Sequence, residues 1–261
     1  MSEYVHYEVG DDFIATITLD KPARRNALDD EMGDALEAAL AAAGEDDKVR
    51  VVILTGAGGA FSSGRDLVDL ANRPPEKRGR TRENVAEGGF WFVTACPKPV
   101  VAAVDGPAVG WGVEISSHCD VRIASDSARF GWVFAHRGLV TDTAAGTWIL
   151  PRIVGFAEAA RLLYSGEIID AAEALRIGYV QAVVPRKDLM AAARAEAARF
   201  AKGSPFAIRR LKRLLWGGPS QSALEHYQAN REALFECFLS ADHKEGVAAF
   251  LEKRPAVFTG R

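Results

Sequence analysis

A single carboxylate, Glu114, follows two glycines in the segment Gly110-Trp111-Gly112-Val113-Glu114. The apolar run VVAAV at 100–104 precedes it and is typical of a buried strand, and the following DGP is a turn signal. The residues after the second glycine suit a helix, so the carboxylate is predicted in its first turn. There it can act as an acid or base beside backbone N–H groups that face a ligand. It can equally serve only to complement the helix dipole.

A second glycine-rich turn, TGAGGAFSSGRDL at 55–67, also follows an apolar strand-like run. Its spacing matches neither GxGxxG nor GxxxxGK[ST], which argues against a dinucleotide or P-loop site. A tight turn after a strand can instead direct backbone N–H groups at a developing oxyanion. The turns at 63–65 and 110–112 can each supply one such N–H, but the sequence alone does not bring them together.

The elements that position these turns alternate in type through the first part of the chain. Apolar or alternating runs at 13–19, 49–56, 99–106 and 121–125 predict strands, and 29–43 predicts a helix. Such alternation implies crossover connections and parallel pairing. Runs at 170–178, 187–203, 204–218 and 220–254 predict helices, with one strand at 179–185. We therefore expect an α/β core at 1–200 and a helical region at 201–261.

Two polar stretches leave their roles open. The segment 72–89 is rich in polar residues, proline and glycine, and predicts either a plain surface loop or a lid over a substrate. The run 208–216 places apolar residues at helical spacing, so its basic side chains are expected on a solvated face or against a phosphate-bearing ligand. These basic side chains are Arg209, Arg210, Lys212 and Arg213.

Composition bounds the function classes. The chain has 261 residues, is 48% hydrophobic and carries a formal net charge of -3, which argues against a nucleic-acid groove as the main site. No apolar run reaches the roughly 18 residues of a membrane span. Its three cysteines lack metal-ligand spacing, and the N-terminal residues do not form a signal peptide, so a cytoplasmic location is expected.

Several stretches in order resemble the crotonase superfamily, the enoyl-CoA hydratase/isomerase family. They are ITLDKPARRNAL, VRVVILTGAGGAFSSGRDL, KPVVAAVDGPAVGWGVEISSHCDVRIASDSARFG, LPRIVG, AAEALRIGYVQAVVP and EGVAAFLEKRPAVFTGR. The resemblance spans nearly the whole chain. It implies a crotonase-like spiral of ββα turns, a C-terminal helical trimerisation region, and homotrimers or hexamers. It also implies acyl-CoA thioester substrates, with CoA as part of the substrate, and neither a separate cofactor nor a metal.

The resemblance assigns roles to residues of both turns. The backbone N–H groups of Arg65 and Trp111 match the family's oxyanion donors, and Glu114 matches its first catalytic glutamate. Many relatives have glycine where this chain has Trp111, so the indole is expected to narrow or cover the pocket. The resemblance nominates further residues for the substrate or CoA: Arg25, Ala27, Leu28, Ser63, Arg65, Asp66, Leu67, Gly110, Phe134 and His136.

One departure from the family pattern concerns the second hydratase glutamate, whose place is taken by Phe134. Hydration by two carboxylates is therefore incomplete. A carboxylate recurs eight residues later as Asp142, where dienoyl-CoA isomerases and 4-chlorobenzoyl-CoA dehalogenases place a working aspartate. The dehalogenase's tryptophan and histidine positions fall at Phe134 and Trp91, which argues against that reaction. Asp142 can transfer a proton, or it can merely cap the helix predicted from Thr143.

These features together predict an enzyme that stabilises a thioester enolate and hydrates or isomerises an enoyl-CoA double bond. An unusual, cyclic enoyl-CoA is one candidate substrate. A C–C hydrolase or lyase on the same scaffold is the enzymatic alternative, and a non-catalytic acyl-CoA-binding relative is the alternative from another class. A pure binder needs neither Glu114 nor Asp142.

Overall fold

The computed structural model of the protein describes residues 3–72 and 91–261. Its main sheet has six strands in the order β1-β2-β3-β4-β6-β9. The first pair is antiparallel and the remaining neighbours are parallel. The strands are β1 (Val5–Val9), β2 (Ile14–Leu19), β3 (Val51–Gly56), β4 (Val100–Val104), β6 (Val121–Ser125) and β9 (Ala182–Val184).

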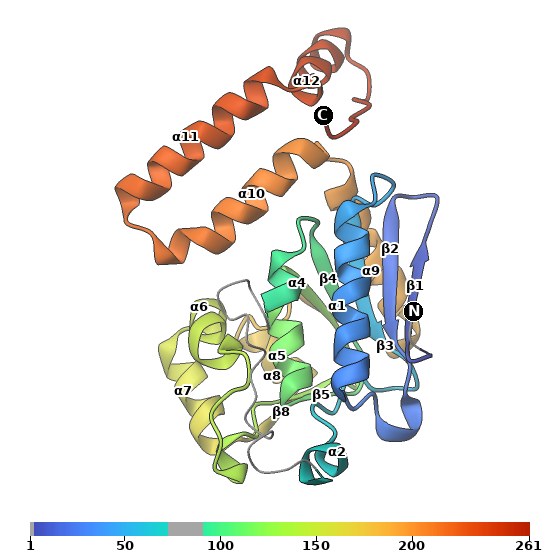
Figure 1. The fold of residues 1–261 in the computed structure, drawn as a ribbon, viewed down its shortest axis with the longest axis vertical. Coiled ribbons are helices and arrows are strands. Elements are labelled where there is room, and N and C mark those ends of the chain that lie inside the picture. The colour runs from blue at the N-terminus through green and yellow to red at the C-terminus, as the bar shows by residue number, and fades with distance from the viewer. Residues whose placement is uncertain (1–2, 73–90) are drawn as a thin grey trace.

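Helices cover both faces of this sheet (Figure 1). Helix α1 (Asp30–Glu45) contacts β1 and β2, and α9 (Leu189–Ala201) contacts β2, β3, β4 and β6 from the other side. Alternate residues of β3 enter the two layers: Val52 joins the larger core, while Ile53 packs in the cluster that includes α9. The near-continuous apolar strands of the sequence are therefore strands buried on both faces.

A second, smaller sheet carries the turns of interest. It contains β5 (Pro107–Val109), β7 (Arg129–Gly131) and β8 (Ile168–Asp170) in the order β5-β7-β8. Isolated bridges join Ser62 to Ala108 and Leu28 to Arg65, so the glycine-rich turn after β3 extends the same stack. Each turn of the chain thus passes from the large sheet to the small one and then into a helix, which is the predicted spiral of ββα turns.

Helix α5 (Trp111–His118) starts directly after β5 and is buried along its whole length. Its C-terminal end is fixed by Arg122, which is 4% exposed and donates to the backbone oxygens of Ser116 at 3.2 Å and Cys119 at 2.7 Å. The Arg122 Nε atom also donates to the Tyr179 oxygen at 2.7 Å. A buried guanidinium thus links carbonyl groups at the end of the helix to a carbonyl group more than fifty residues away along the chain.

The chain between β7 and β8 folds into short helical segments beside α5. They are η4 (Ala135–Arg137), the π-helical turn η5 (Ala145–Ile149), α6 (Leu150–Val154) and α7 (Phe156–Ser165). A single helix beginning near Thr143 was predicted here, and this is wrong because the backbone takes a left-handed conformation at Ala144 and then a π-helical turn. Two more short helices, α2 (Leu67–Asn72) and α4 (Phe92–Ala95), lie on either side of the undescribed segment.

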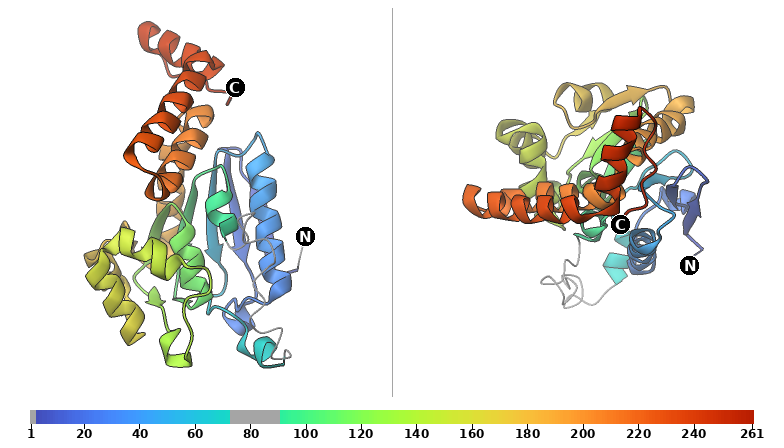
Figure 2. Two further views of the ribbon diagram at one scale, coloured as in Figure 1. Left: turned by 60° about the vertical axis from the view of Figure 1, so that its left-hand side comes forward. Right: turned by 90° about the horizontal axis from the view of Figure 1, so that it is seen from above.

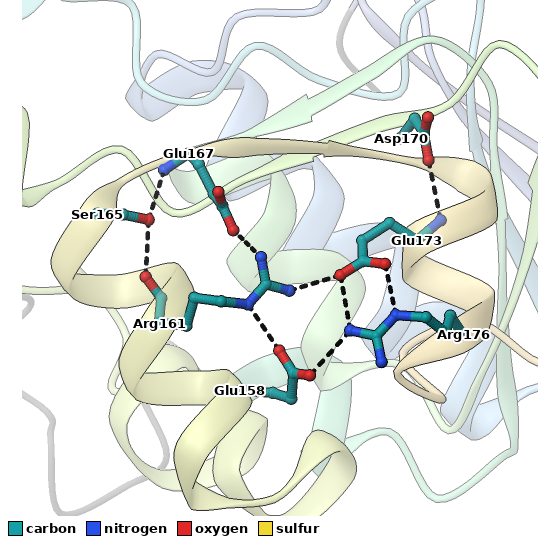
Figure 3. Close-up of polar contacts among 7 residues, drawn as sticks. All are labelled: Glu158, Arg161, Ser165, Glu167, Asp170, Glu173 and Arg176. Atoms are coloured by element: carbon teal, nitrogen blue, oxygen red, sulfur yellow. Dashed lines mark hydrogen bonds and ion pairs between the residues drawn. The ribbon is translucent and has the colours of Figure 1, made fainter.

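An ion-pair network connects α7 to α8 (Ala171–Arg176) (Figure 3). Arg161 of α7 pairs with Glu158, Glu167 and Glu173, and Arg176 of α8 pairs with Glu158 and Glu173. These groups lie at the surface, where single pairs stabilise little and a network mainly fixes geometry. The network holds α7 in place, and Leu163 of this helix packs near Gly146 of η5.

Helices α10 (Pro205–Gly217), α11 (Ala223–Leu239) and α12 (Ala241–Glu252) extend away from the sheets (Figures 1 and 2). A solvated face, one of the two roles expected for the basic residues of α10, is wrong for Lys212, which is 6% exposed. Its ammonium lies 2.9 Å from both Asp120 and the Lys98 oxygen, whereas Leu215 on the apolar stripe is 75% exposed. The division of the chain into a core at 1–200 and a helical region at 201–261 remains a prediction. The loop predicted for 72–89 lies outside the described residues, apart from Asn72.

We predict that Arg122→Met lowers the free energy of unfolding by about 2 kcal/mol or more, because several buried carbonyl groups lose their donor. Urea unfolding at one protein concentration measures the change. Arg129→Met is the matched control: Arg129 is exposed and its guanidinium donates to the neighbouring Ala128 oxygen, so a change within about 0.5 kcal/mol is expected. Equal effects of the two substitutions would contradict the anchoring role of Arg122.

Candidate active site

The two glycine-rich turns predicted to supply N–H groups lie against each other. A Cβ atom built on Gly64 would fall 2.5 Å from the Val109 oxygen and 3.0 Å from the Trp111 nitrogen. A Cβ on Gly112 would fall 2.3 Å from the Ser62 oxygen. Gly64 also has φ of +91°, a conformation that favours glycine. Side chains are excluded at both positions, so the two backbones make direct contact.

The turn that contains Asn26 holds the Gly64 turn in place through hydrogen bonds. The buried Asn26 amide donates to the backbone oxygens of Ala57 at 2.9 Å and Ala60 at 2.7 Å. The Leu28 N–H donates to the Gly64 oxygen at 2.7 Å. The RNAL segment therefore orients the backbone from which the Arg65 N–H projects.

The other turn ends at the first residue of α5, Trp111. Amide groups in the first turn of a helix have no acceptor within the helix and point out of its N-terminus. The Trp111 indole is 4% exposed and reaches α1, where a Cβ on Gly33 would fall 2.9 Å from the indole edge. The Arg65 guanidinium lies 4.4 Å from the indole centroid. The two residues with the predicted oxyanion N–H groups are thus in contact.

A pocket opens next to this contact. Seven residues nominated from the sequence line it: Ser63, Arg65, Leu67, Gly110, Trp111, Phe134 and Asp142. Five others also line it: Leu70, Val109, Val133, Arg137 and Leu139. Most of these lining residues are apolar or glycine, and Asp142 is the one carboxylate among the described residues of the lining. Such a lining suits the acyl part of a substrate and leaves few polar groups to orient it.

Glu114 lies one helical turn after Trp111, is 0% exposed, and is not among the lining residues of that pocket. Its Oε2 atom accepts hydrogen bonds from the Thr143 N–H at 3.2 Å, the Thr143 hydroxyl at 2.8 Å and the Ala145 N–H at 3.1 Å. Its Oε1 atom has no hydrogen-bond partner in the described part of the chain, and a Cβ on Gly146 would fall 2.9 Å from it.

Burial raises the pKa of Glu114 to about 7. The hydrogen bonds from Thr143 oppose this rise, and the nearby charge of Asp142 adds to it. A carboxyl group with a pKa near 7 can both accept and return a proton at neutral pH. Because three donors occupy Oε2, the proton belongs on Oε1.

Asp142 differs from Glu114 in its exposure, because it lies in the pocket wall and retains exposed surface. The surrounding protein atoms still displace water, and this desolvation raises the pKa of Asp142, opposed by the charge of Arg65. The alternative role as a helix cap is wrong: the N-cap of the π-helical turn is Ala144, and no side chain caps it. Asp142 is therefore available for a role in the pocket.

The other nominated residues lie outside the pocket lining. Asp66 caps α2 by accepting from the Val68 N–H at 3.0 Å, and Leu28 is fully buried. Arg25 and Ala27 belong to the turn that contains Asn26, where the Arg25 oxygen accepts from the Ser63 N–H. His136 is exposed and lies against Gly166, where a Cβ would fall 3.0 Å from its ring.

Comparison with known proteins places this geometry in a family. The model of the enoyl-CoA hydratase/isomerase family matches residues 10–261. The chain belongs to this family. It is 42% identical to a probable enoyl-CoA hydratase of Rhodobacter capsulatus, over 98% of each chain. It is 34% identical to the 1,2-epoxyphenylacetyl-CoA isomerase of Escherichia coli over 100% of both, and 35% identical to the crotonyl-CoA hydratase of Syntrophomonas wolfei over 95% of both.

The fold agrees with this assignment. A crystal structure of an enoyl-CoA hydratase from Bacillus anthracis matches with a TM-score of 0.92 at 32% identity, covering 99% of this chain and 100% of that one. Like its relatives, the chain is an acyl-CoA enzyme of the hydratase/isomerase type. Among residues 3–72 and 91–261, no helix is long and apolar enough to cross a membrane, and no cluster of three candidate metal ligands occurs.

Sequence reasoning missed two residues that surround the family's glutamate, Thr143 and His118. Thr143 contacts Glu114 across 29 residues of sequence, and His118 contacts Thr143 from the end of α5. One signal was present: the polar run Ser116-Ser117-His118 in a helix otherwise suited to burial. Buried polar residues require partners, so this run indicates a hydrogen-bond network.

We predict that Glu114→Gln stabilises the protein at high pH. The pKa of Glu114 is raised from its ordinary 4.5 to about 7, so the folded state binds the proton more tightly than the unfolded state. The resulting destabilisation is absent below about pH 4.5, grows as the pH rises and is complete above about pH 7, where it approaches 3 kcal/mol. Glutamine carries no charge, so Glu114→Gln removes this destabilisation.

Urea unfolding of both proteins at about pH 5 and about pH 8.5 measures this difference. The stability gain of Glu114→Gln over the unsubstituted protein should be larger at the higher pH by about 2–3 kcal/mol. Glu8→Gln, on the exposed edge strand β1, is the control and should show the same stability as the parent at both pH values. A gain for Glu114→Gln that does not change with pH would refute the raised pKa.

Proposed function

We propose that this enzyme isomerises the double bond of an enoyl-CoA and hydrates simple enoyl-CoA thioesters only slowly. The observation that carries this proposal is the position of Asp142 in the same pocket wall as Phe134, Arg65 and Trp111. A second carboxyl group is thus present, but not at the position where hydratases of the family carry their second glutamate.

In the proposed reaction the Arg65 and Trp111 N–H groups bind the thioester oxygen. Each such donor lowers the barrier by about 3 kcal/mol, because negative charge develops on that oxygen as a proton leaves carbon. Polarisation of the carbonyl group acidifies the α and γ protons. One carboxylate removes a proton from one of these carbons, the electron pair moves through the enolate, and a carboxyl group returns a proton to the other.

Proton transfer balances without an oxidant or reductant, so the proposed reaction needs no redox cofactor. Hydration would instead need a water molecule held between an acid and a base. Phe134 is 7% exposed and offers no group that could hold water. The names of the relatives include both a hydratase and an isomerase at similar identity, so they do not decide between the reactions.

We expect Glu114→Gln and Asp142→Asn each to lower turnover of the best enoyl-CoA substrate by about 10²-fold or more, because each amide keeps its size but cannot accept a proton. Turnover of straight-chain and cyclic enoyl-CoA thioesters is the measurement. Asp126→Asn, at the exposed β6–β7 turn, serves as the control and should retain full turnover.

Full turnover by Asp142→Asn would contradict the proposed acid/base pair. Rapid hydration of crotonyl-CoA by the unsubstituted enzyme would contradict the preference for isomerisation. Either result would point to Glu114 as the one carboxylate that the reaction needs.

The proposed active form is a homotrimer or a hexamer. The C-terminal helices expose large apolar side chains, more than a soluble monomer commonly leaves in contact with water. They include Leu239 (81% exposed), Phe250 (82%) and Leu251 (72%). Leu234, Phe235 and Phe238 of α11 are also exposed, and Phe258 is partly buried.

Light scattering at micromolar concentration should give the mass of three or six chains. Phe250→Glu should lower that mass while the fold persists, because Phe250 contributes little to the core of its own chain. Circular dichroism provides the check on folding. A parent protein that scatters as a monomer would contradict this assembly.

A further inference from the structure

A row of buried polar side chains leads from Glu114 away from the pocket. The Thr143 hydroxyl lies 2.8 Å from Glu114 Oε2 and 3.1 Å from His118 Nε2. The other ring nitrogen, His118 Nδ1, lies 2.9 Å from the Thr94 hydroxyl. His118 and Thr143 are 1% and 5% exposed, so water does not compete for these bonds. His118 follows Glu114 by four residues and therefore shares its face of α5.

Trp91 contacts two members of this row, Thr143 and His118. Its indole Nε1 donates to the Thr143 backbone oxygen at 3.0 Å. Its ring meets the His118 ring in an edge-on contact, with centroids 5.2 Å apart and planes at 64°. The imidazole is thus held by hydrogen bonds at both nitrogens and by an aromatic contact with Trp91.

The proton positions in this row follow from the chemistry of its two ends. An ionised Glu114 can only accept, so the Thr143 hydroxyl donates its single proton to Oε2. The Thr143 oxygen must then accept from His118, which places the imidazole proton on Nε2 and leaves Nδ1 to accept from Thr94. Every bond in the row then points toward Glu114, and bonds aligned in this way strengthen one another.

We propose that His118 is a positioning residue that, by donating from Nε2 to Thr143, holds the Thr143 hydroxyl on Glu114 Oε2 and reserves Oε1 for proton exchange with the substrate. This inference rests on the proposed acid/base role of Glu114. His118 acts through Thr143 and does not itself contact the reacting atoms.

His118 performs this role as a neutral group, because burial lowers its pKa to about 3. The elements packed closest on α5 are α4, β5 and η5, and none of them contains an ionisable side chain apart from the thiol of the adjoining Cys96. At the far side of α5, Tyr179 and Arg122 contact Ser116 and bond neither His118 nor Thr143 in the described residues.

Asp142 also acts on Glu114, because its negative charge raises the pKa of Glu114. Arg65 in turn lowers the pKa of Asp142. Both remain in place when His118 is replaced, so a change caused by that replacement reports the Thr143 bond.

The test measures the pKa of Glu114 directly, by infrared titration of its carboxyl band, which is assigned by its loss in Glu114→Gln. Loss of the His118 donor frees the Thr143 hydroxyl to turn away, so His118→Leu should raise the pKa of Glu114 by about half a unit or more. Thr143→Val should raise it at least as far. The acid limb of kcat/KM should move to higher pH by the same amount in each variant.

A double variant separates positioning from packing. If His118 acts through Thr143, His118→Leu in the Thr143→Val background should add no further shift. His118→Gln, which keeps both a donor and an acceptor, should restore most of the parent value. Ser117→Ala is the matched control: Ser117 is equally buried on α5 but bonds Val113 and Tyr179, so its replacement should lower stability without moving the pKa of Glu114.

An unchanged Glu114 pKa in His118→Leu, or shifts that add in the double variant, would overturn the proposal. If His118→Leu does not fold, Thr94→Val tests the same row from its far end and should give a smaller shift in the same direction. Full turnover by Glu114→Gln would refute the acid/base role instead, while the infrared titration of Glu114 would still test the contact with His118.

Discussion

Two stretches of backbone approach so closely beside the pocket that neither can carry a side chain at the point of contact. A Cβ atom on Gly64 or Gly112 would overlap the oxygen of Val109 or Ser62. This contact places the start of α5 beside the end of the Gly64 turn, and the Asn26 amide and the Leu28 N–H hold that turn in register. The site therefore depends on backbone that packs against backbone.

Burial of Glu114 is the second constraint, and it works against stability. A carboxylate removed from water is retained because Thr143 and Ala145 donate to one of its oxygens, while the other faces Gly146 at close range. The left-handed Ala144 and the π-helical turn after it bring these groups around the carboxylate. Irregular backbone of this kind is common at functional sites, where geometry takes precedence over regular structure.

Much of this arrangement could be predicted from the sequence because its signals are local. The helix predicted for 29–43 is α1, with Asp29 as its N-cap, and the apolar runs became β2, β3, β4 and β6. The glycine spacing indicated two tight turns, and the resemblance to relatives placed them together. These features depend on neighbouring residues or on motifs longer than ten residues.

The rest could not be predicted because it depends on contacts between distant residues. Lys212 is buried because Asp120 and a carbonyl group of residue 98 meet its ammonium, and helical periodicity alone carries no sign of them. The hydrogen bonds of Thr143 depend on a π-helical turn that interrupts the predicted helix. His136 could not be placed either, since its position against Gly166 depends on how α7 packs.

We propose that two backbone N–H groups hold the thioester while two carboxyl groups face its reactive carbons. A crystal structure with an unreactive enoyl-CoA analogue tests it most directly. We expect the thioester oxygen within about 3 Å of the Arg65 and Trp111 nitrogens, with Glu114 Oε1 and Asp142 directed at the α and γ carbons. A thioester oxygen bound away from both nitrogens, or an acyl chain that leaves Asp142 in water, would contradict it.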